Sequence, residues 1–341
     1  MSDFPVSYAY RAYGLTCSSN ASISAFSPRA TTPGLPDVVF EISTGVPGWV
    51  QGARNLPSSI RYTQPGQLEN PTHTVTAFGN GEFFELAYAD GTRFVIDGDA
   101  KRIWGACWPP LTLDHLTIYL QGPVMGFLLR RRGITALHAS AVCIGGQAVV
   151  LCGPTEAGKS TTAAALALRG AAVLSDDITV IRESRHEFHA ESGAQRICLW
   201  PDAVRALLRT TDALPRLTPD WEKCFLPLDG HTAKFIADRQ PIGAIYVLSS
   251  RTAEENAPRI EDLTPREALL ELVRNTYMNW LLEQRHRVSE FDVLSKLVMQ
   301  VPVRRIVPHS DPARIGALSE LIVRDAERLS ARSAPIVVAS H

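Results

Sequence analysis

A glycine-rich segment near the middle of the chain has the residue types and spacing of a phosphate-binding loop. It starts at Gly153, and Gly158-Lys159-Ser160 follows after four intervening residues. In such loops the glycines let backbone N–H groups point at phosphate oxygens, and the N-terminus of the next helix adds positive charge. The lysine reaches the β- and γ-phosphates, and the serine hydroxyl binds magnesium. The pattern therefore predicts a site for ATP and Mg²⁺, formed by Gly153, Pro154, Thr155, Glu156, Ala157, Gly158, Lys159, Ser160 and Thr161.

Two consecutive carboxylates, Asp176 and Asp177, follow the apolar run at 171–174. Adjacent side chains at a strand end point in different directions, so one carboxylate can face the metal and the other an acceptor hydroxyl. A single carboxylate serves the metal in most nucleotide hydrolases with this type of loop. The second one therefore indicates a general base that takes the proton of an attacking hydroxyl. A solvated turn at the end of the strand is the alternative.

Several other side chains could act near a phosphate, although each also has an ordinary structural explanation. His138 lies on the strand before the loop, and a histidine beside apolar residues is more often structural. Four basic residues could neutralise a transferring phosphate, with ordinary surface charge as the alternative for each: Arg196, Lys223, Lys234 and Arg251. Lys234 is favoured among them because it follows the turn at Asp229-Gly230. Trp200 could stack on adenine, but packing in the core is favoured.

The elements around the loop predict an α/β domain. Apolar strands are expected at 137–144 and 147–152, joined by a tight hairpin at Gly145-Gly146. The loop follows the second strand directly and opens a helix at 160–169. The rest of the domain is expected to contain strands at 171–174, 178–181, 196–200, 242–249 and 301–307, and helices at 202–208, 265–280, 289–300 and 311–330.

The residues before this domain predict a separate β-rich domain at 1–110. Alternating runs at 72–78, 81–89 and 92–97 are separated by Asn80-Gly81 and Asp90-Gly91, which predicts an antiparallel meander. A helix expected at 113–132 ends in three arginines. They could bind phosphate, but stabilisation of the negative end of the helix dipole is favoured. The phosphate-loop domain would then cover 111–330, and residues 331–341 would form a flexible tail.

Composition excludes several classes of protein. The 341 residues are 45% hydrophobic and 20% charged, which is typical of a globular protein. With 34 Lys+Arg against 35 Asp+Glu, the net charge of -1 provides no basic surplus for nucleic acid or an anionic membrane. The six cysteines contain no Cys-x-x-Cys pair, so reduced thiols are expected. The start of the chain has no export signal and no run is apolar enough to span a membrane, so a cytoplasmic protein is expected.

The central segment resembles the kinase core of the HPr kinase/phosphorylase family. The resemblance rests on Leu137-His138-Ala139-Ser140-Ala141-Val142, the phosphate loop, and Leu174-Ser175-Asp176-Asp177. His138 lies 15 residues before Gly153, and Asp176 lies 17 residues after Lys159. This likeness implies that His138 lies near the reacting phosphate and that Asp176 is the base toward a serine hydroxyl. It also implies that Asp177 assists in positioning magnesium or phosphate.

The chain as a whole is more similar to the stand-alone kinases of this family that are encoded with ribosomal peptide clusters, among them the lasso peptide kinases. The supporting segments are Gly122-Pro123, Leu199-Trp200-Pro201-Asp202 and Val301-Pro302-Val303. The resemblance implies an ATP-dependent kinase that phosphorylates a serine at the C-terminus of a precursor peptide. Its fold would be an HPr-kinase-like α/β domain with phosphate loop, preceded by the β-rich domain.

Two alternatives remain open at this stage. One is an HPr(Ser) kinase/phosphorylase that regulates metabolism, and the other is a nucleotide switch without kinase activity. The second carboxylate argues against a switch, which needs only one for the metal. The partner is expected to be a precursor peptide or small protein, bound through a strand edge of the N-terminal domain. A homo-oligomer is left open, and no nucleic acid or membrane partner is expected.

Overall fold

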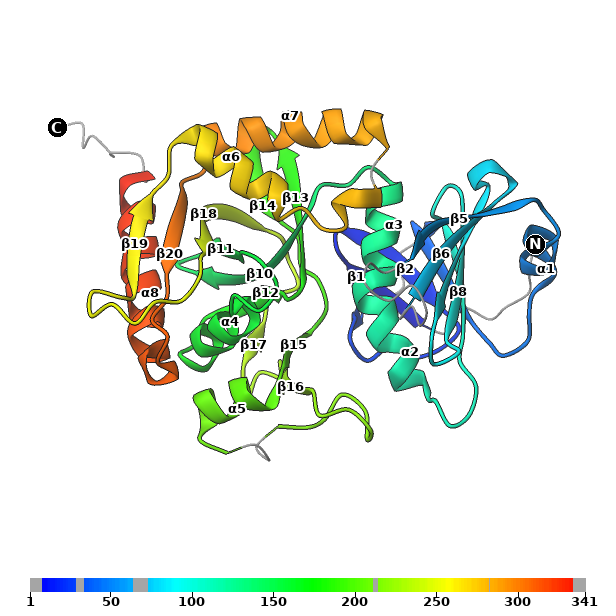
Figure 1. Ribbon diagram of the computed structural model, residues 1–341, viewed down its shortest axis with the longest axis horizontal. Helices are drawn as coiled ribbons and strands as arrows, with labels where there is room; N and C mark the ends of the chain where they lie inside the picture. The colour runs from blue at the N-terminus through cyan, green and yellow to red at the C-terminus, as the bar shows by residue number, and fades with distance from the viewer. Residues whose placement is uncertain (1–7, 29–33, 64–72, 211–213, 282, 334–341) are drawn as a thin grey trace. The chain divides into compact units, whose positions relative to one another are not determined.

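The computed structural model describes residues 8–28, 34–63, 73–210, 214–281 and 283–333 (Figure 1). By their internal contacts, the residues form two compact units. The first unit covers 1–134 with 280–282, and the second covers 135–279 with 283–341. The sequence-based boundary at residue 110 differs from this division, which assigns the helical segment after residue 112 to the first unit. Among the described residues, no helix is both long enough and apolar enough to cross a membrane.

A nine-stranded sheet forms the first unit, in the order β3-β1-β2-β4-β9-β8-β7-β6-β5. The predicted meander is confirmed, because β6 to β9 pair antiparallel in sequence order. Asn80, Gly81 and Gly91 all have positive φ, as the tight turns require. The strands are β1 Tyr8–Ala12, β2 Leu15–Ser19, β3 Ser27–Pro28, β4 Val38–Ile42, β5 Ser58–Thr63, β6 His73–Phe78, β7 Phe83–Tyr88, β8 Arg93–Asp97 and β9 Arg102–Ala106. Residue 72, which was included in the first predicted strand, lies outside the described residues.

Two helical segments cover this sheet. The short helix α1 (Gly48–Arg54) packs Val50 against Val95 and Trp104. The predicted helix at 113–132 is confirmed in position but contains a π-helical turn, η2 (Leu120–Val124), between α2 (Leu113–Tyr119) and α3 (Met125–Arg131). Pro123 lies within that turn. Proline has no N–H to donate and its ring displaces the carbonyl of the preceding turn, which accounts for the widening.

Aromatic contacts hold the α2–α3 segment against the first sheet. The rings of Tyr119 and Tyr88 stack with centroids 3.9 Å apart, and Phe127 lies 5.2 Å from Phe84. Such pairs add to the burial of apolar area, which is the main favourable term in folding. This packing is the physical reason why the segment belongs with the first unit rather than with the phosphate-loop domain.

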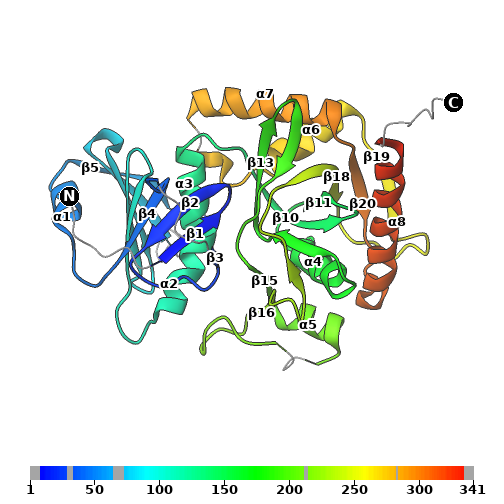
Figure 2. The same ribbon diagram turned by 180° about the vertical axis from the view of Figure 1, so that it is seen from behind.

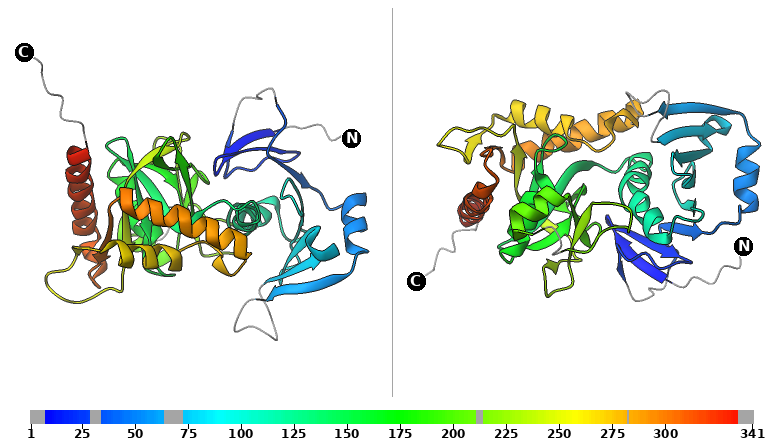
Figure 3. Two further views of the ribbon diagram at one scale, coloured as in Figure 1. Left: turned by 90° about the horizontal axis from the view of Figure 1, so that it is seen from above. Right: turned by 60° about the horizontal axis from the view of Figure 1, so that its bottom comes forward.

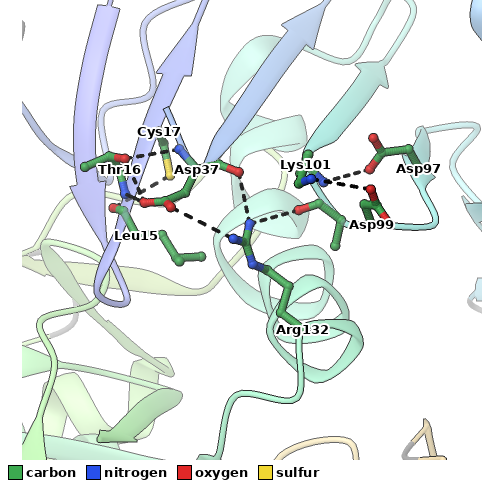
Figure 4. A network of polar contacts seen from close by, with 9 residues as sticks. Leu15, Thr16, Cys17, Asp37, Asp97, Asp99, Lys101 and Arg132 are labelled. Carbon is green, nitrogen blue, oxygen red and sulfur yellow. Dashed lines mark hydrogen bonds and ion pairs between the residues drawn. The ribbon is translucent and has the colours of Figure 1, made fainter. Parts of the chain in front are cut away.

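The three arginines at the end of α3 bond to the first unit. Arg132 donates to the carbonyl oxygens of Asp37 and Ala100, at 2.9 and 3.2 Å (Figure 4). The Asp37 carboxylate in turn accepts from both the backbone N–H and the hydroxyl of Thr16. Arg132 thereby links the helix end to the segments that lead into β4 and β9.

Arg130 and Arg131 also make contacts within the first unit. Arg130 is 2% exposed and donates to the carbonyl of Ile134. The Arg131 guanidinium lies over the Phe84 ring, 4.5 Å from its centroid, and donates to the Gly98 carbonyl. These contacts give the arginine run a structural role, made through carbonyls and an aromatic ring, whereas the favoured explanation from the helix dipole stays a prediction.

A second nine-stranded sheet forms the centre of the second unit. Its order is β17-β12-β10-β13-β14-β18-β20-β19, and β11 pairs with both β10 and β18. A separate two-stranded ribbon consists of β15 and β16. The strands are β10 Ala136–Ile144, β11 Gln147–Cys152, β12 Ala172–Ser175, β13 Ile178–Ser184, β14 Glu187–Ala190, β15 Arg196–Leu199, β16 Cys224–Pro227, β17 Lys234–Phe235, β18 Gln240–Leu248, β19 Arg259–Asp262 and β20 Val303–Val307.

Successive residues of a strand point to opposite faces of the sheet. In this sheet both faces carry apolar side chains, and helices cover both of them. The helices α4 to α8 lie around this sheet (Figures 1, 2 and 3). Val149 and Leu151 of β11 pack on one face with residues of α4, α5 and α8, whereas Val150 of the same strand packs with residues of α6 and α7. The predicted α/β layering is therefore present. The helices are α4 Lys159–Leu168, α5 Pro201–Leu208, α6 Pro265–Arg274, α7 Gln284–Gln300 and α8 Ile315–Ser333.

Several boundaries expected for the second unit differ from the structure, and the helix expected at 289–300 already begins at Gln284. The helix expected at 265–280 ends at Arg274, because the next residues pair with β10: Tyr277 donates to the Ala136 carbonyl, and the Asn275 carbonyl accepts from His138. Tertiary pairing overrides the helical periodicity there. Of the tail expected at 331–341, the first three residues belong to α8, and the others lie outside the described residues.

We predict that Arg132→Ala lowers the stability of the first unit by about 1–3 kcal/mol, because two partly buried carbonyl acceptors lose a charged donor. Urea denaturation followed by circular dichroism and tryptophan fluorescence measures the change. Lys101→Ala is the matched control, since the Lys101 ammonium makes an exposed contact with Asp99 at 3.4 Å. It should change stability by less than about 0.5 kcal/mol. Equal effects of both substitutions would contradict the role of Arg132.

Candidate nucleotide-binding and catalytic site

The glycine-rich segment lies between β11 and α4, in the strand–loop–helix arrangement that the sequence predicts. Gly153 has φ +146°, and a Cβ there would lie 2.6 Å from the Leu248 carbonyl oxygen at the end of β18. Because β18 runs parallel to β11, the two strands end together and leave no room for a side chain. Gly158 has φ +99° and is the N-cap of α4. Both positions therefore require glycine for a physical reason.

The Lys159 ammonium folds back over its own loop. It donates to the carbonyl oxygens of Gly153 and Pro154, both at 2.9 Å, and the residue is 7% exposed. Desolvation lowers the pKa of Lys159, and the nearby carboxylates of Asp177 and Asp176 offset part of that effect. The loop thus places a cation beside the first N–H groups of a helix, which is an arrangement suited to anions.

The two aspartates lie opposite β10 because β12 and β13 pair with the same strand one after the other. Ser175 at the end of β12 faces Ala141, and Ile178 at the start of β13 faces His138. Asp177 has φ +69°, so a left-handed residue makes the connection between the strands. Consequently, Asp176 and Asp177 lie opposite residues 139 and 140, directly beside the loop.

Asp176 is 6% exposed and has hydrogen bonds to three separate elements. One carboxylate oxygen, Oδ1, accepts from the hydroxyls of Ser140 at 2.7 Å and Ser160 at 2.8 Å. The other, Oδ2, accepts from the backbone N–H of Cys198 at 3.0 Å. Desolvation raises the pKa of Asp176 despite these bonds. The carboxylate is therefore a fixed, buried group that is joined directly to the serine of the loop.

Asp177 is more open to solvent, with 47% of its side chain exposed. His138 Nδ1 lies 3.2 Å from Oδ1, and the Tyr277 hydroxyl donates to Oδ2 at 3.2 Å. Desolvation is the largest single influence and favours the neutral acid, but the contacts with His138 and Tyr277 and the charge of Lys223 outweigh it. Together they lower the pKa of Asp177. Asp177 is thus an ionised carboxylate that solvent or a substrate can reach.

The structure brings together His138, Lys159, Ser160, Asp176 and Asp177, as expected for one site. The sequence reasoning missed the contacts of Ser140, Tyr277 and Cys198 with the aspartates. Ser140 had a detectable signal, because residues two apart on a strand face the same side, as His138 and Ser140 do. Tyr277 had no such signal, since it reaches the site through pairing with a distant strand.

Among the candidate basic residues, the one that lies near the aspartates is not the one that the sequence favours. Lys234, which was favoured, is exposed and pairs with Ala172 at the start of β12, at the opposite end from the aspartates. Lys223 instead lies close enough to lower the pKa of Asp177. Its ammonium is 5.3 Å from the centre of the Trp200 ring. Trp200 is 60% exposed, so the expectation that it packs in the core is wrong.

The donor atoms around Ser160 fit magnesium better than softer metals. Mg²⁺ prefers oxygen ligands and takes one or two carboxylates, completing its shell with water and substrate phosphates. The Ser160 hydroxyl and the Asp176 carboxylate provide such oxygens, 2.8 Å apart. Within the described ranges, no group of three His, Cys, Asp or Glu residues could form an all-protein metal site. All six cysteines are free thiols, as expected.

Comparison with known proteins adds little to this description. Neither a protein-family profile nor a curated protein sequence matches the chain. Among solved structures, the Hpr(Ser) kinase/phosphatase from Coxiella burnetii is similar over 60% of this chain and 99% of that chain. The sequence identity is 10% and the TM-score is 0.35. At this level, the likeness identifies neither the activity nor the substrate of this chain.

We predict that Gly153→Ala destabilises the second unit by roughly 3 kcal/mol or more, because backbone strain and the clash with the Leu248 carbonyl add together. Gly170→Ala is the matched control, since Gly170 also has positive φ (+103°) but a Cβ there meets nothing within 4 Å. It should cost about 1–2 kcal/mol from backbone strain alone. Thermal unfolding of both variants measures the difference, and equal costs would contradict the close approach of the loop to β18.

Proposed function

We propose that this protein is a kinase that transfers the γ-phosphoryl group of ATP to a serine hydroxyl, with magnesium. The observation that carries the proposal is the direct bond between Ser160 and Asp176, next to an accessible Asp177 paired with His138. A nucleotide switch needs the first carboxylate but has no use for the second. A hydroxyl acceptor requires a group that can take its proton, and Asp177 provides one.

The geometry supports roles for the two aspartates opposite to those expected from the sequence resemblance. Asp176 is buried and already bonded to Ser160, so it would hold magnesium through the loop serine. Asp177 is exposed and ionised, so it would accept the serine proton, with His138 and Tyr277 fixing its orientation. Bound magnesium would neutralise charge that develops on the phosphates.

In the proposed reaction, the serine oxygen forms a bond to the γ-phosphorus while the bond to the bridging oxygen of ADP breaks. The serine proton passes to the Asp177 carboxylate. Such transfers depend mainly on positioning and charge neutralisation, because the transition state is loose and little covalent chemistry falls to the protein. Lys159 provides the positive charge at the loop, and its ammonium must turn from the carbonyls of Gly153 and Pro154 toward the phosphates.

For the acceptor, we propose a serine of a ribosomal precursor peptide, at its C-terminus as in lasso peptide kinases. The support is the sequence resemblance in segments such as Leu199-Trp200-Pro201-Asp202. Trp200 is exposed and lies against the ammonium of Lys223, whose charge acts on Asp177, so an incoming peptide would meet an aromatic and a cationic side chain there. Incubation with MgATP and synthetic peptides ending in serine, read by mass spectrometry, tests this point. An acceptor found only as a folded HPr-like protein would contradict it.

We predict that Lys159→Ala lowers the turnover number by about 10²-fold or more, because the charge that stabilises the transferring phosphate is lost. Calorimetry with MgATP and an assay for ADP formation measure binding and turnover. Lys296→Ala is the control, since this exposed lysine on α7 pairs with Asp292. It should behave as the wild type. If Lys159→Ala keeps full activity, the loop is not the phosphate site and the proposed function fails.

The two aspartates should respond differently to substitution. Asp176→Asn should weaken magnesium binding, so that excess magnesium restores part of the rate. Asp177→Asn should leave MgATP affinity within about threefold but reduce transfer by roughly 10²–10⁴-fold at every magnesium concentration, because no base remains. Rates over a magnesium titration provide the test. Rescue of Asp177→Asn but not of Asp176→Asn would restore the roles implied by the sequence resemblance.

A further inference from the structure

An arginine that the proposed mechanism does not use lies against the phosphate loop. A guanidinium nitrogen of Arg251, Nη2, is 3.0 Å from the position that a Cβ on Gly158 would occupy. Gly158 is the residue immediately before Lys159 and is the N-cap of α4. The guanidinium therefore lies beside the helix terminus at which the loop would hold phosphate.

The position of Arg251 follows from the pairing of two parallel strands. Arg251 follows β18, which runs parallel to β11, so both strands end at the same edge of the sheet. Sequence proximity does not explain its position near the loop, because Arg251 lies 93 positions after Gly158 in the chain. The carboxyl ends of neighbouring parallel strands are where ligands bind in open α/β sheets.

Hydrogen bonds fix the backbone on both sides of Arg251. Ser249 N–H donates to the carbonyl of Ile306 at 2.9 Å, and Thr252 N–H donates to the carbonyl of Pro308 at 3.0 Å. The Thr252 carbonyl also accepts from the N–H of Ser310 at 2.8 Å. Arg251 thus lies in a segment whose backbone is held by hydrogen bonds, so less conformational entropy is lost when the arginine binds a ligand.

The charge of Arg251 is available to a ligand. The residue is exposed, and no carboxylate among the described residues forms an ion pair with it. In contrast, Arg259, further along the same segment, pairs with both Glu254 and Glu261. A planar guanidinium suits phosphate oxygens because two of its N–H groups can bond to one phosphate.

We propose that Arg251 binds the phosphates of the nucleotide, as a second cation beside Lys159. This inference rests on the proposed function, since it assumes that the loop holds a nucleoside triphosphate. Lys159 approaches the phosphates from within the loop, whereas Arg251 approaches from the end of β18. Arg251 therefore governs nucleotide affinity, and the transfer step depends on Lys159 and the aspartates.

The test is a calorimetric titration of the full chain with MgATP and MgADP, at several salt concentrations. Arg251→Ala should raise the dissociation constants for both nucleotides about tenfold, as expected for the loss of one charge-assisted contact. Arg251→Lys should recover part of the affinity. Arg251→Ala should also show a weaker dependence of affinity on salt, because one fewer charge takes part in binding.

Arg239→Ala is the matched control, because Arg239 is also exposed and precedes β18, at the opposite end of the strand. It should bind both nucleotides as the wild type does. Melting temperatures without nucleotide should agree among all variants, which separates ligand binding from a structural effect. Wild-type affinity in Arg251→Ala would overturn the inference.

The same titrations distinguish a failure of the proposed function from a failure of the inference about Arg251. If the wild type binds neither nucleotide, both the function and the role of Arg251 are wrong. If binding is lost in Lys159→Ala but unchanged in Arg251→Ala, the nucleotide site stands and the inference about Arg251 alone is overturned. If binding weakens in Arg251→Ala and not in Arg251→Lys, positive charge at this position is what the nucleotide requires.

Discussion

The carboxylate of Asp176 connects the parts of the candidate site. Its two oxygens accept hydrogen bonds from β10 through Ser140, from α4 through Ser160 and from β15 through the N–H of Cys198. These elements come from different parts of the chain. A buried, desolvated carboxylate is costly unless it is hydrogen-bonded, so its bonds hold the strand, the loop helix and the ribbon in register. The positions of the other side chains in the candidate site depend on this arrangement.

Two neighbouring aspartates acquire different chemical properties from this geometry. Burial raises the pKa of Asp176, whereas His138, Tyr277 and Lys223 together lower the pKa of Asp177. Asp177 has a left-handed backbone and 47% of its side chain is exposed, whereas Asp176 is buried. Pairs of titratable groups whose environments separate their pKa values are frequent in active sites. Here the separation assigns one carboxylate to the loop serine and leaves the other for an incoming group.

In the first unit, charged side chains also connect separate segments of the chain. Arg132 bonds to the carbonyls of two residues that precede strands, and Arg131 covers an aromatic ring. A run of three arginines resembles a phosphate site when read as sequence, but each guanidinium makes contacts within the unit. Arg251, by contrast, is only one of four candidate phosphate contacts in the sequence and is not the favoured one, yet it lies beside the loop. Charge type alone therefore does not separate structural arginines from those that lie near the candidate site.

The sequence by itself determined the local elements and the existence of the loop. Gly153, Gly158 and the hairpin glycines need backbone conformations that other residues rarely adopt, and alternation of apolar residues marks the strands. These signals act within a few residues, so they can be read without the fold. The end of α6, the placement of Lys234 far from the aspartates and the exposure of Trp200 could not be read in this way.

Only the tertiary structure decided which residues meet. Tyr277 contacts Asp177 because the segment after α6 pairs with β10, and Arg251 reaches Gly158 because β18 lies parallel to β11. Neither pairing leaves a pattern in the sequence near the residues concerned. The roles of the two aspartates depend in the same way on burial and on partners from distant strands. Local propensity acts over a few residues, whereas the chemistry of the site depends on strand pairings between residues that are distant in the sequence.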